Sequence, residues 1–228
     1  MTTQPYKIAV LGGTGAEGSG LALRLAAAGH IVTVGSRSAE KAATAAADMS
    51  KRLGGTTIAG ADNLRAAAAA EIVILTVPYA AERMTVEEVR GSLQGKILVD
   101  ATVPLVPPRI SRVQLPQGAS AVAAIQELVG DSVRVVSAFQ NISSHHLKEL
   151  DHEIDCDVLV CGDDNAACDT VIGIVADIGL RGIYAGPICN SAAAEALTSL
   201  LIAINRRYKV PSSGLRVTGL RDRTEQKT

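Results

Sequence analysis

Residues 7–18 read Lys-Ile-Ala-Val-Leu-Gly-Gly-Thr-Gly-Ala-Glu-Gly, a short apolar run that leads into a glycine-rich turn. The last six residues have the spacing G-x-G-x-x-G. Glycines at this spacing let the backbone turn tightly and approach a pyrophosphate, and the following helix offers free N–H groups and the positive end of its dipole. The stretch predicts a dinucleotide site, with a purely structural turn as the alternative. The residues expected at the dinucleotide are Gly13, Thr14, Gly15, Ala16, Glu17 and Gly18.

The next apolar run, residues 31–34, ends in Gly35-Ser36-Arg37, with Lys41 one helical turn later. An acid at this strand end would bond the ribose 2′-hydroxyl and repel a 2′-phosphate. An arginine reverses both effects, because it forms a charge-assisted pair with the phosphate. We therefore expect NADP rather than NAD, with Thr14 adding a hydroxyl from the neighbouring turn. In the alternative, Arg37 and Lys41 are solvated surface charges.

Apolar runs alternate with helical patterns along the first half of the chain, and the run 72–75 is apolar at every position, as in strands buried on both faces. The chain is therefore predicted to be an α/β protein, a Rossmann-type, doubly wound and mostly parallel sheet with a small C-terminal α/β part. The predicted strands are 7–11, 31–34, 56–59, 72–77, 96–100, 133–138, 157–161 and 182–185, and the predicted helices are 17–28, 39–52, 63–70, 85–93, 120–128, 165–178 and 190–205.

Three parts are expected along the chain. Residues 1–140 form an NADP-binding domain, residues 141–220 a small domain for the acceptor side and for oligomerisation, and residues 221–228 a flexible, charged tail. The helix 190–205 carries an apolar stripe, which suits a homo-oligomer, most simply a dimer, with core packing as the alternative. The stripe consists of Leu197, Leu200, Leu201 and Ile204.

Composition excludes several classes of function. The net charge of −1 and the near absence of aromatic residues (no Trp, one Phe, four Tyr) argue against a nucleic-acid partner. The N-terminal residues lack a signal-peptide pattern and no uninterrupted apolar run reaches about 18 residues, so we expect a cytoplasmic protein with no membrane partner. The four cysteines have no metal-ligand spacing, and Asp163-Asp164 is typical of a turn with a helix cap, so no metal is expected.

Two further segments follow predicted strands, where open α/β sheets bind ligands. The first is Thr76-Val77-Pro78-Tyr79, with a strand-ending proline as the alternative. The second is Ser137 to Ile142, whose Gln140 and Asn141 can bond a carboxamide or a ring, with simple loop polarity as the alternative. The remaining candidates are titratable groups, with a solvent-facing role as the alternative for the histidines and a paired or surface carboxylate as the alternative for the glutamate. They are His145, His146, His152 and Glu195.

The chain resembles the NADPH-dependent F420 reductase (F420:NADP oxidoreductase) family. The resemblance rests on Val10 to Gly15, Gly35-Ser36-Arg37, Thr76-Val77-Pro78, Ser137-Ala138, Val160-Cys161-Gly162-Asp163-Asp164, Ala185-Gly186-Pro187 and Asn190-Ser191. It implies hydride transfer between NADP(H) and the deazaflavin coenzyme F420 in a cleft, by an enzyme that is usually a dimer. It also implies the contacts: Thr14, Ser36, Arg37 and Lys41 to the 2′-phosphate, Val77, Pro78 and Ala138 to the nicotinamide side, and the backbone of Gln140, Asn141 and Ile142 on the deazaflavin side. We also expect Thr76 at the cofactor and Tyr79 on the acceptor side, because they lie at the carboxyl end of the same predicted strand.

Direct transfer between two stacked rings needs positioning and exclusion of water, so no catalytic side chain is assigned. Two alternatives remain open. One is an NADP-dependent reductase of an imine or small carbonyl compound, with Tyr79, His145 or His146 as the proton donor. The other is a non-catalytic NADP-binding sensor, or a subunit that docks through helix 190–205.

Overall fold

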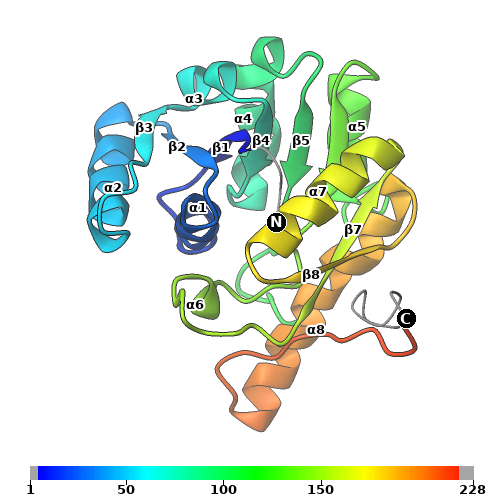
Figure 1. The fold of residues 1–228 in the computed structure, drawn as a ribbon. Helices are drawn as coiled ribbons and strands as arrows, with labels where there is room; N and C mark the ends of the chain where they lie inside the picture. The colour runs from blue at the N-terminus through cyan, green and yellow to red at the C-terminus, as the bar shows by residue number, and fades with distance from the viewer. Residues whose placement is uncertain (1–4, 221–228) are drawn as a thin grey trace, which may run out of the picture.

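One eight-stranded sheet runs through the computed structural model, which describes residues 5–220 (Figure 1). The strands are β1 (Lys7–Leu11), β2 (Ile31–Ser36), β3 (Ala59–Asp62), β4 (Ile72–Leu75), β5 (Ile97–Asp100), β6 (Arg134–Ser137), β7 (Asp157–Gly162) and β8 (Arg181–Tyr184). Their order in the sheet is β3-β2-β1-β4-β5-β6-β7-β8. The helices are α1 (Ala16–Ala27), α2 (Ala39–Arg52), α3 (Asn63–Ala69), α4 (Tyr79–Val89), α5 (Ala121–Val129), α6 (Ser144–Leu147), α7 (Asn165–Asp177) and α8 (Ser191–Tyr208), with short 3-10 turns at Arg90–Ser92 and Ile188–Asn190.

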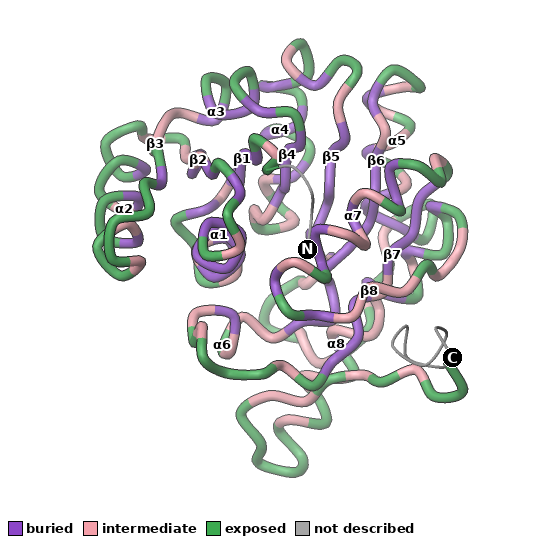
Figure 2. Tube along the Cα trace, viewed as in Figure 1, coloured by how far each residue is buried: buried purple, intermediate pink, exposed green. Residues whose placement is uncertain are grey.

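Strand β1 is covered on both faces, and its four residues after Lys7 are all apolar and buried (Figure 2). Ile8 and Val10 face the core layer that contains α1, α2 and α7. Ala9 and Leu11 face the opposite layer, built from α3, α4 and α5. Because neighbouring side chains point to opposite faces, a strand covered on both sides favours apolar residues at every buried position.

Pairing is parallel from β3 through β6 and again between β7 and β8. Only the pair β6–β7 is antiparallel, with Ser137 opposite Cys161. The predicted α/β class and its doubly wound, mostly parallel sheet are therefore confirmed. Because β7 pairs with β6, the residues after position 140 continue the same sheet as the residues before it.

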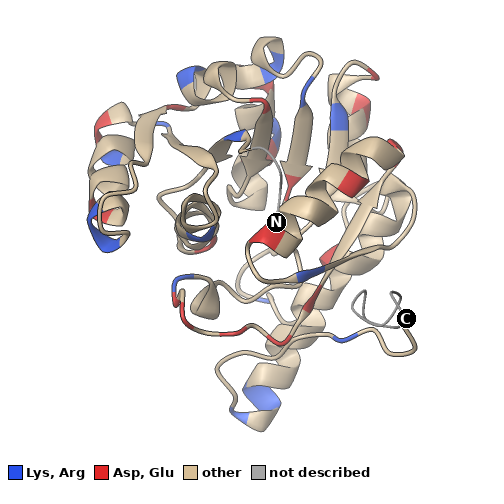
Figure 3. Cartoon of the chain, viewed as in Figure 1, with Lys and Arg blue, Asp and Glu red and all other residues tan. Residues whose placement is uncertain are grey.

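The charged residues form no basic stripe on the described chain. Lys and Arg lie scattered among acidic residues in Figure 3.

The register of the parallel strands aligns their carboxyl ends. Leu11 pairs with Gly35 on one side and with Leu75 on the other, and Leu75 pairs with Asp100, which pairs with Ser137. These five residues form one row across the sheet, which we call the edge row. Each chain segment that leaves the edge row enters the same region above the carboxyl edge, at the reversal of strand order between β1 and β4.

Most predicted elements exist, and β1 and α2 match to the residue. Helix α4 was expected at 85–93 but begins at Tyr79, and strand β4 ends at Leu75 instead of residue 77. The cause is Pro78, whose φ of −57° suits the start of a helix, so the proline opens α4 as well as ending the strand segment. Strand β3 lies at Ala59–Asp62 rather than 56–59, because Gly60 packs directly against the backbone of Ala42 in α2.

Helix α8 is long, apolar and largely open on one side. Within the described residues, the stretch Ile188–Tyr208 has a mean hydropathy of 1.3 and is, by length and composition alone, long and apolar enough to cross a membrane. Only 28% of its most apolar part is buried. The prediction that the chain has no such stretch rested on the length of uninterrupted apolar runs. It therefore did not detect a helix in which Ser, Thr and Asn interrupt the apolar residues. The stripe is not core either, since Leu200 is 46% and Ile204 41% exposed.

The inner side of α8 is tied to the rest of the fold by polar contacts. Glu195 is buried and accepts hydrogen bonds from Ser120 Oγ at 2.7 Å and from the backbone N–H of Ala121 at 2.8 Å. Of the two alternatives for this side chain, the paired carboxylate is therefore confirmed and the surface carboxylate is not, because Glu195 binds the N-terminus of α5. Asp164 caps α7 as predicted, accepting from the Ala167 N–H at 2.8 Å. The predicted flexible tail lies outside the described residues.

Candidate functional site

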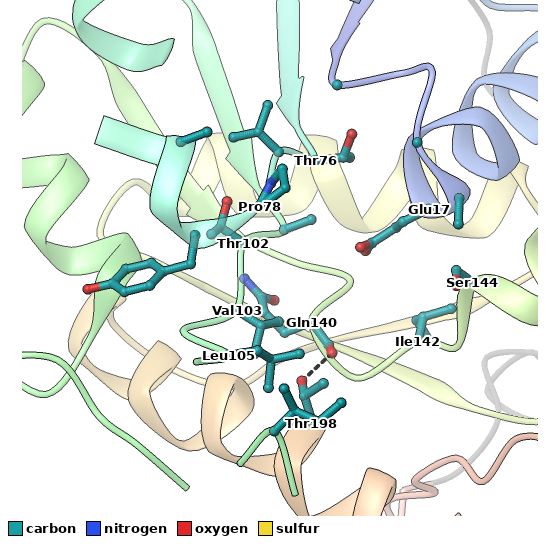
Figure 4. A pocket seen from close by; sticks show the side chains of 18 of the residues that line it. Glu17, Thr76, Pro78, Thr102, Val103, Leu105, Gln140, Ile142, Ser144 and Thr198 are labelled. Carbon is teal, nitrogen blue, oxygen red and sulfur yellow. Dashed lines mark hydrogen bonds between the residues drawn. The ribbon is translucent and has the colours of Figure 1, made fainter. Parts of the chain in front are cut away.

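A cavity of about 910 Å³ opens above the edge row (Figure 4). Its walls come from α8 and from the segments that follow β1, β2, β4, β5 and β6. The cavity is at the upper end of the usual size range for ligand pockets. The predicted residues that line it are Thr14, Gly15, Ala16, Glu17, Ser36, Arg37, Thr76, Val77, Pro78, Tyr79, Gln140, Asn141 and Ile142.

Four predicted residues lie outside the lining, namely Gly13, Gly18, Lys41 and Ala138. Gly18 has a structural reason to be glycine, because a Cβ there would lie 2.7 Å from the Gly12 carbonyl oxygen and would meet the Thr76 hydroxyl. The same holds for Gly13, where a Cβ would lie 2.8 Å from the Val10 carbonyl oxygen. These glycines bring α1 close to β1 and β4, so they shape the turn from behind.

The glycine turn is held at the edge of the sheet by backbone contacts. The Gly12 N–H donates to the Gly35 carbonyl at 3.1 Å, and the Gly15 N–H donates to the Gly12 carbonyl at 2.9 Å. Gly12 has a φ of +81°, which favours glycine. The N-terminus of α1 therefore faces the cavity with N–H groups that no side chain caps, which suits an anion.

Arg37 lies at the other end of this wall, directly after β2. It is exposed and forms no ion pair within residues 5–220. Ser38 caps α2 by accepting from the Lys41 N–H at 3.3 Å, which starts that helix beside Arg37. An unpaired guanidinium beside a hydroxyl and a helix start is the chemistry that a phosphate monoester needs.

Acidic side chains gather below the cavity floor. Asp100, in the edge row, and Glu82, from α4, are both buried. Burial, the nearby Asp100 charge and a hydrogen bond to Asp100 raise the pKa of Glu82 to about 10. Burial also raises the pKa of Asp100, to about 6, against the lowering effect of hydrogen bonds from Thr102. The pair therefore holds a proton at neutral pH, and Glu82 carries it.

Glu17 brings a carboxyl group to the cavity itself, pointing from α1 toward its centre in Figure 4. Loss of water around the group and, secondarily, the charge of Asp100 raise the pKa of Glu17 to about 8. At neutral pH the group is therefore mostly uncharged, so it does not repel a phosphate at the glycine turn.

The segment after β6 turns sharply into the cavity wall. Phe139, which is buried, has a φ of +77°, a strained value for a bulky residue. Gln140 Nε2 donates to the Asp100 carbonyl at 2.6 Å, while its buried Oε1 has no partner within the described chain. The Asn141 amide is already used, because its Nδ2 donates to the Asp157 carbonyl at 2.6 Å. Of the two amides, Gln140 is the one with an oxygen left for a ligand.

Sequence reasoning missed much of the lining. The unassigned residues include Asn63, Thr102, Val103, Leu105, Pro107, Ile110, Ser143, Ser144, Thr198, Leu201, Ile202, Asn205 and Ser213. Asn63 and Thr102 follow β3 and β5 as closely as the predicted residues follow their strands, so the strand-end rule applies to both. The apolar wall from the loop after β5 and from α8 has no such local signal.

Only one of the three expected proton donors lines the cavity. Tyr79 is part of its wall, at the start of α4, whereas His145 and His146 are outside the lining. Burial is the main cause that raises the pKa of Tyr79, followed by the charges of Glu82 and Glu195. A phenol with a raised pKa stays protonated at neutral pH.

We expect Glu82→Gln to reduce the pH dependence of folding stability. Between its ordinary pKa of 4.5 and about 10, folded Glu82 keeps a proton that the unfolded chain releases, so stability falls as pH rises through this window. Each such group contributes a slope of up to about 1.4 kcal/mol per pH unit. Urea unfolding from about pH 5 to about pH 8 measures it, with exposed Glu88→Gln as the control. Equal slopes in wild type and Glu82→Gln would show that Glu82 is ionised in the folded protein.

Comparison with known proteins identifies relatives over nearly the whole chain. The family model described as NADP oxidoreductase coenzyme F420-dependent matches residues 7–104. Proteins named F420-dependent NADP reductase from Methanothermobacter thermautotrophicus and Methanocaldococcus jannaschii are each 41% identical, with 94% of this chain and 95% and 99% of theirs aligned.

Solved structures agree with the sequence relatives. A crystal structure from Arthrobacter sp. FB24, provisionally described as an F420-dependent NADP-reductase, is 27% identical with a TM-score of 0.77, covering 93% of this chain and 99% of its own. A reductive aminase from Aspergillus terreus in complex with NADPH shares the fold, with a TM-score of 0.62, 23% identity, and coverage of 90% of this chain and 63% of its own. The resemblance found in the sequence is confirmed, and the chain belongs to the family of F420-dependent NADP reductases.

Proposed function

We propose that this chain transfers a hydride between NADP(H) and coenzyme F420. The observation that carries the proposal is one continuous cavity that begins at the glycine turn and Arg37 and ends at an apolar wall from α8. A nucleotide fits the first end by charge, and a second, flat partner fits the other end by apolar contact. The 41% identity to F420-dependent NADP reductases over 94% of the chain supports the same pair of ligands.

In this proposal residues 1–140 hold NADP. The glycine turn binds the pyrophosphate, Ser36, Arg37 and Lys41 bind the 2′-phosphate with Thr14, and the segment 76–78 together with Ala138 flanks the nicotinamide. Gly13 and Gly18 act through the backbone, because any larger residue would force the turn away from β1. The neutral state of Glu17 keeps the first turn of α1 attractive to an anion.

Residues 141–220, with Tyr79 and Gln140, form the acceptor side. Val103, Leu105, Leu201 and Ile202 give this end of the cavity an apolar surface. The free Oε1 of Gln140 offers one acceptor at its floor, and the Thr198 hydroxyl donates to the Gln140 carbonyl at 2.6 Å, which fixes that residue against α8. Asn141 and Ile142 contribute backbone and shape.

NADPH and F420 supply the hydride donor and acceptor, so the protein needs no nucleophile. The residues around the cavity bring the two rings together and remove water between them, which is where the rate enhancement arises. The described lining contains no histidine, so no imidazole takes part in proton transfer there.

The direct test is a mixture of the purified protein with NADPH and F420. We expect loss of the visible absorbance of oxidised F420, and no NADPH oxidation with a panel of imines. Tyr79→Phe and His145→Ala should keep activity within about threefold of wild type, whereas loss of a true general acid costs about 100-fold or more.

Two outcomes would contradict the proposal. Tight NADPH binding without F420 reduction at any pH would favour a sensor. A loss of about 100-fold or more in Tyr79→Phe would favour the reductase of an imine or carbonyl compound with a proton donor.

Arg37→Ala should weaken NADPH far more than NADH. A hydrogen bond to a charged group contributes about 1.5–3 kcal/mol, so we expect the NADPH dissociation constant to rise by about 10- to 100-fold and the NADH constant to stay within about twofold. Fluorescence titration measures both, with Arg52→Ala, an exposed arginine at the end of α2, as the matched control. Equal losses for the two nucleotides would remove Arg37 from the 2′-phosphate site.

We also propose a homodimer formed through α8, in the cytoplasm. Leu200 and Ile204 expose an apolar strip, and Val113 and Leu115 of the neighbouring loop are 44% and 48% exposed. That loop is held along α8, because the Ser199 hydroxyl donates to the Arg112 carbonyl at 3.3 Å. A second copy would cover this strip beside the cavity wall.

The cytoplasmic location rests on a separate observation. The described cysteines are all free thiols, which supports a reducing compartment. Cell fractionation checks the location.

The dimer predicts that wild type sediments at about twice the chain mass of 23.5 kDa. Leu200→Glu should shift the protein to monomer, because it places a charge in the apolar interface. Met84→Glu, at a 60% exposed position on α4, is the control that should not change the mass. A monomeric wild type in sedimentation-velocity experiments, at the concentrations used for activity, would rule the interface out.

A further inference from the structure

Three of the four histidines of this chain lie within eight residues of one another, outside the cavity. The segment runs from α6 toward β7 and contains His145, His146, Glu149 and His152. The rings of His146 and His152 stack with centroids 4.0 Å apart, and the rings of His145 and His146 meet edge to face at 4.8 Å. His146 Nδ1 lies 3.3 Å from Glu149 Oε2, and His152 Nδ1 lies 4.0 Å from the same oxygen.

The backbone of this segment is fixed by Arg24, from the buried side of α1. Its guanidinium donates to the carbonyls of His146 at 3.1 Å, Leu147 at 3.0 Å, Glu149 at 2.7 Å and His152 at 2.9 Å. A single buried cation therefore turns these carbonyls inward. The side chains of His145, Glu149 and His152 are exposed, and that of His146 is half-buried.

Helix packing adds to this support. Helix α6 lies beside α1 in Figure 1, and a Cβ on Gly20 would be 2.5 Å from the Leu147 Cβ, so the two helices touch at a glycine. The cluster is thus built on a backbone that is held before any ligand arrives. Preorganisation of this kind lowers the cost of binding an ion between exposed side chains.

The donor set is typical of a transition metal. Imidazole nitrogens with one carboxylate oxygen bind Zn²⁺ at about 2.0–2.2 Å, which places neighbouring ligand atoms of a tetrahedron about 3.3 Å apart. The pair His146–Glu149 already has this separation, and the ligand atoms of His145, His146 and Glu149 all lie within 4.8 Å of one another. Rotation of the exposed His145 ring closes the remaining distance. Mg²⁺ and Ca²⁺ prefer oxygen ligands and do not suit this set.

We propose that His145, His146 and Glu149, with solvent as the fourth ligand, form a site for a divalent transition metal of the zinc class. The His152 ring stacks on His146 and supports that ligand from the side. The site is structural in position, because the residues just before it, Ser143 and Ser144, line the cavity wall. A metal ion bridging the segment braces that wall from outside. The proposal does not depend on the identity of the hydride acceptor.

The test is a calorimetric titration of Zn²⁺ into protein made without an affinity tag and stripped with a chelator. We expect one Zn²⁺ per chain and no binding of Mg²⁺. His146→Gln should weaken Zn²⁺ binding by about 100-fold, since even the loss of an outer hydrogen-bond partner costs 10- to 100-fold. His145→Gln, at an exposed position, tests the same site with no demand on folding.

Two further measurements make the outcome decisive. Cys189→Ser removes the one exposed thiol among the described cysteines and should leave Zn²⁺ binding unchanged. Co²⁺ bound in place of Zn²⁺ should give the intense visible bands of a four-coordinate site, and Glu149→Gln should reduce them. Absence of Zn²⁺ binding in wild type, or binding that survives both His145→Gln and His146→Gln, would overturn the proposal and leave a cluster held by its imidazole–carboxylate hydrogen bonds alone.

Discussion

The parallel register of the sheet is the constraint on which the site depends. It places Gly35, Leu11, Leu75, Asp100 and Ser137 in one row, so five separate chain segments leave the sheet at the same height. Residues that are distant in sequence, such as Arg37 and Gln140, reach one cavity for this reason alone. A slip of one residue in any strand would turn its side chains to the opposite face and separate the wall that follows it.

Three acidic side chains, one of them in this row, are buried in the fold beside the cavity. Asp100, Glu82 and Glu195 are all buried, and burial is the main cause that raises the pKa of each; the charge of Glu195 raises the pKa of Glu82 and of Asp100 further. Burying a charged carboxylate costs free energy, and the fold reduces this cost in two ways. Glu82 retains its proton, and Glu195 accepts hydrogen bonds from backbone N–H groups at the start of α5. The hydrogen bonds of Glu195 also attach α8 to the start of α5, so a carboxylate outside the cavity lining positions the apolar wall that α8 provides.

Local patterns predicted well which residues line the cavity near the glycine turn and Arg37, and predicted its apolar wall poorly. The glycine turn and Arg37 are recognisable because their chemistry is written within a few residues of a strand end. Val103 and Leu105 come from a proline-rich loop, and Leu201 and Ile202 from a helix about 100 residues later, so only tertiary packing brings them together. Helix α4 was misplaced for a related reason, since Pro78 both ends one element and begins the next.

Helix α1 connects the two halves of the molecule physically. Its N-terminus faces the cavity with free N–H groups, and its last turn carries Arg24, which holds four carbonyls of the segment after α6. The segment that Arg24 holds is continuous with Ile142 and Ser144 of the acceptor wall. Because a helix is rigid over this length, the position of that wall relative to the glycine turn is set by one element and not by the loops between them. A flexible link at this point would leave two rings free to separate, and hydride transfer depends on their staying in contact.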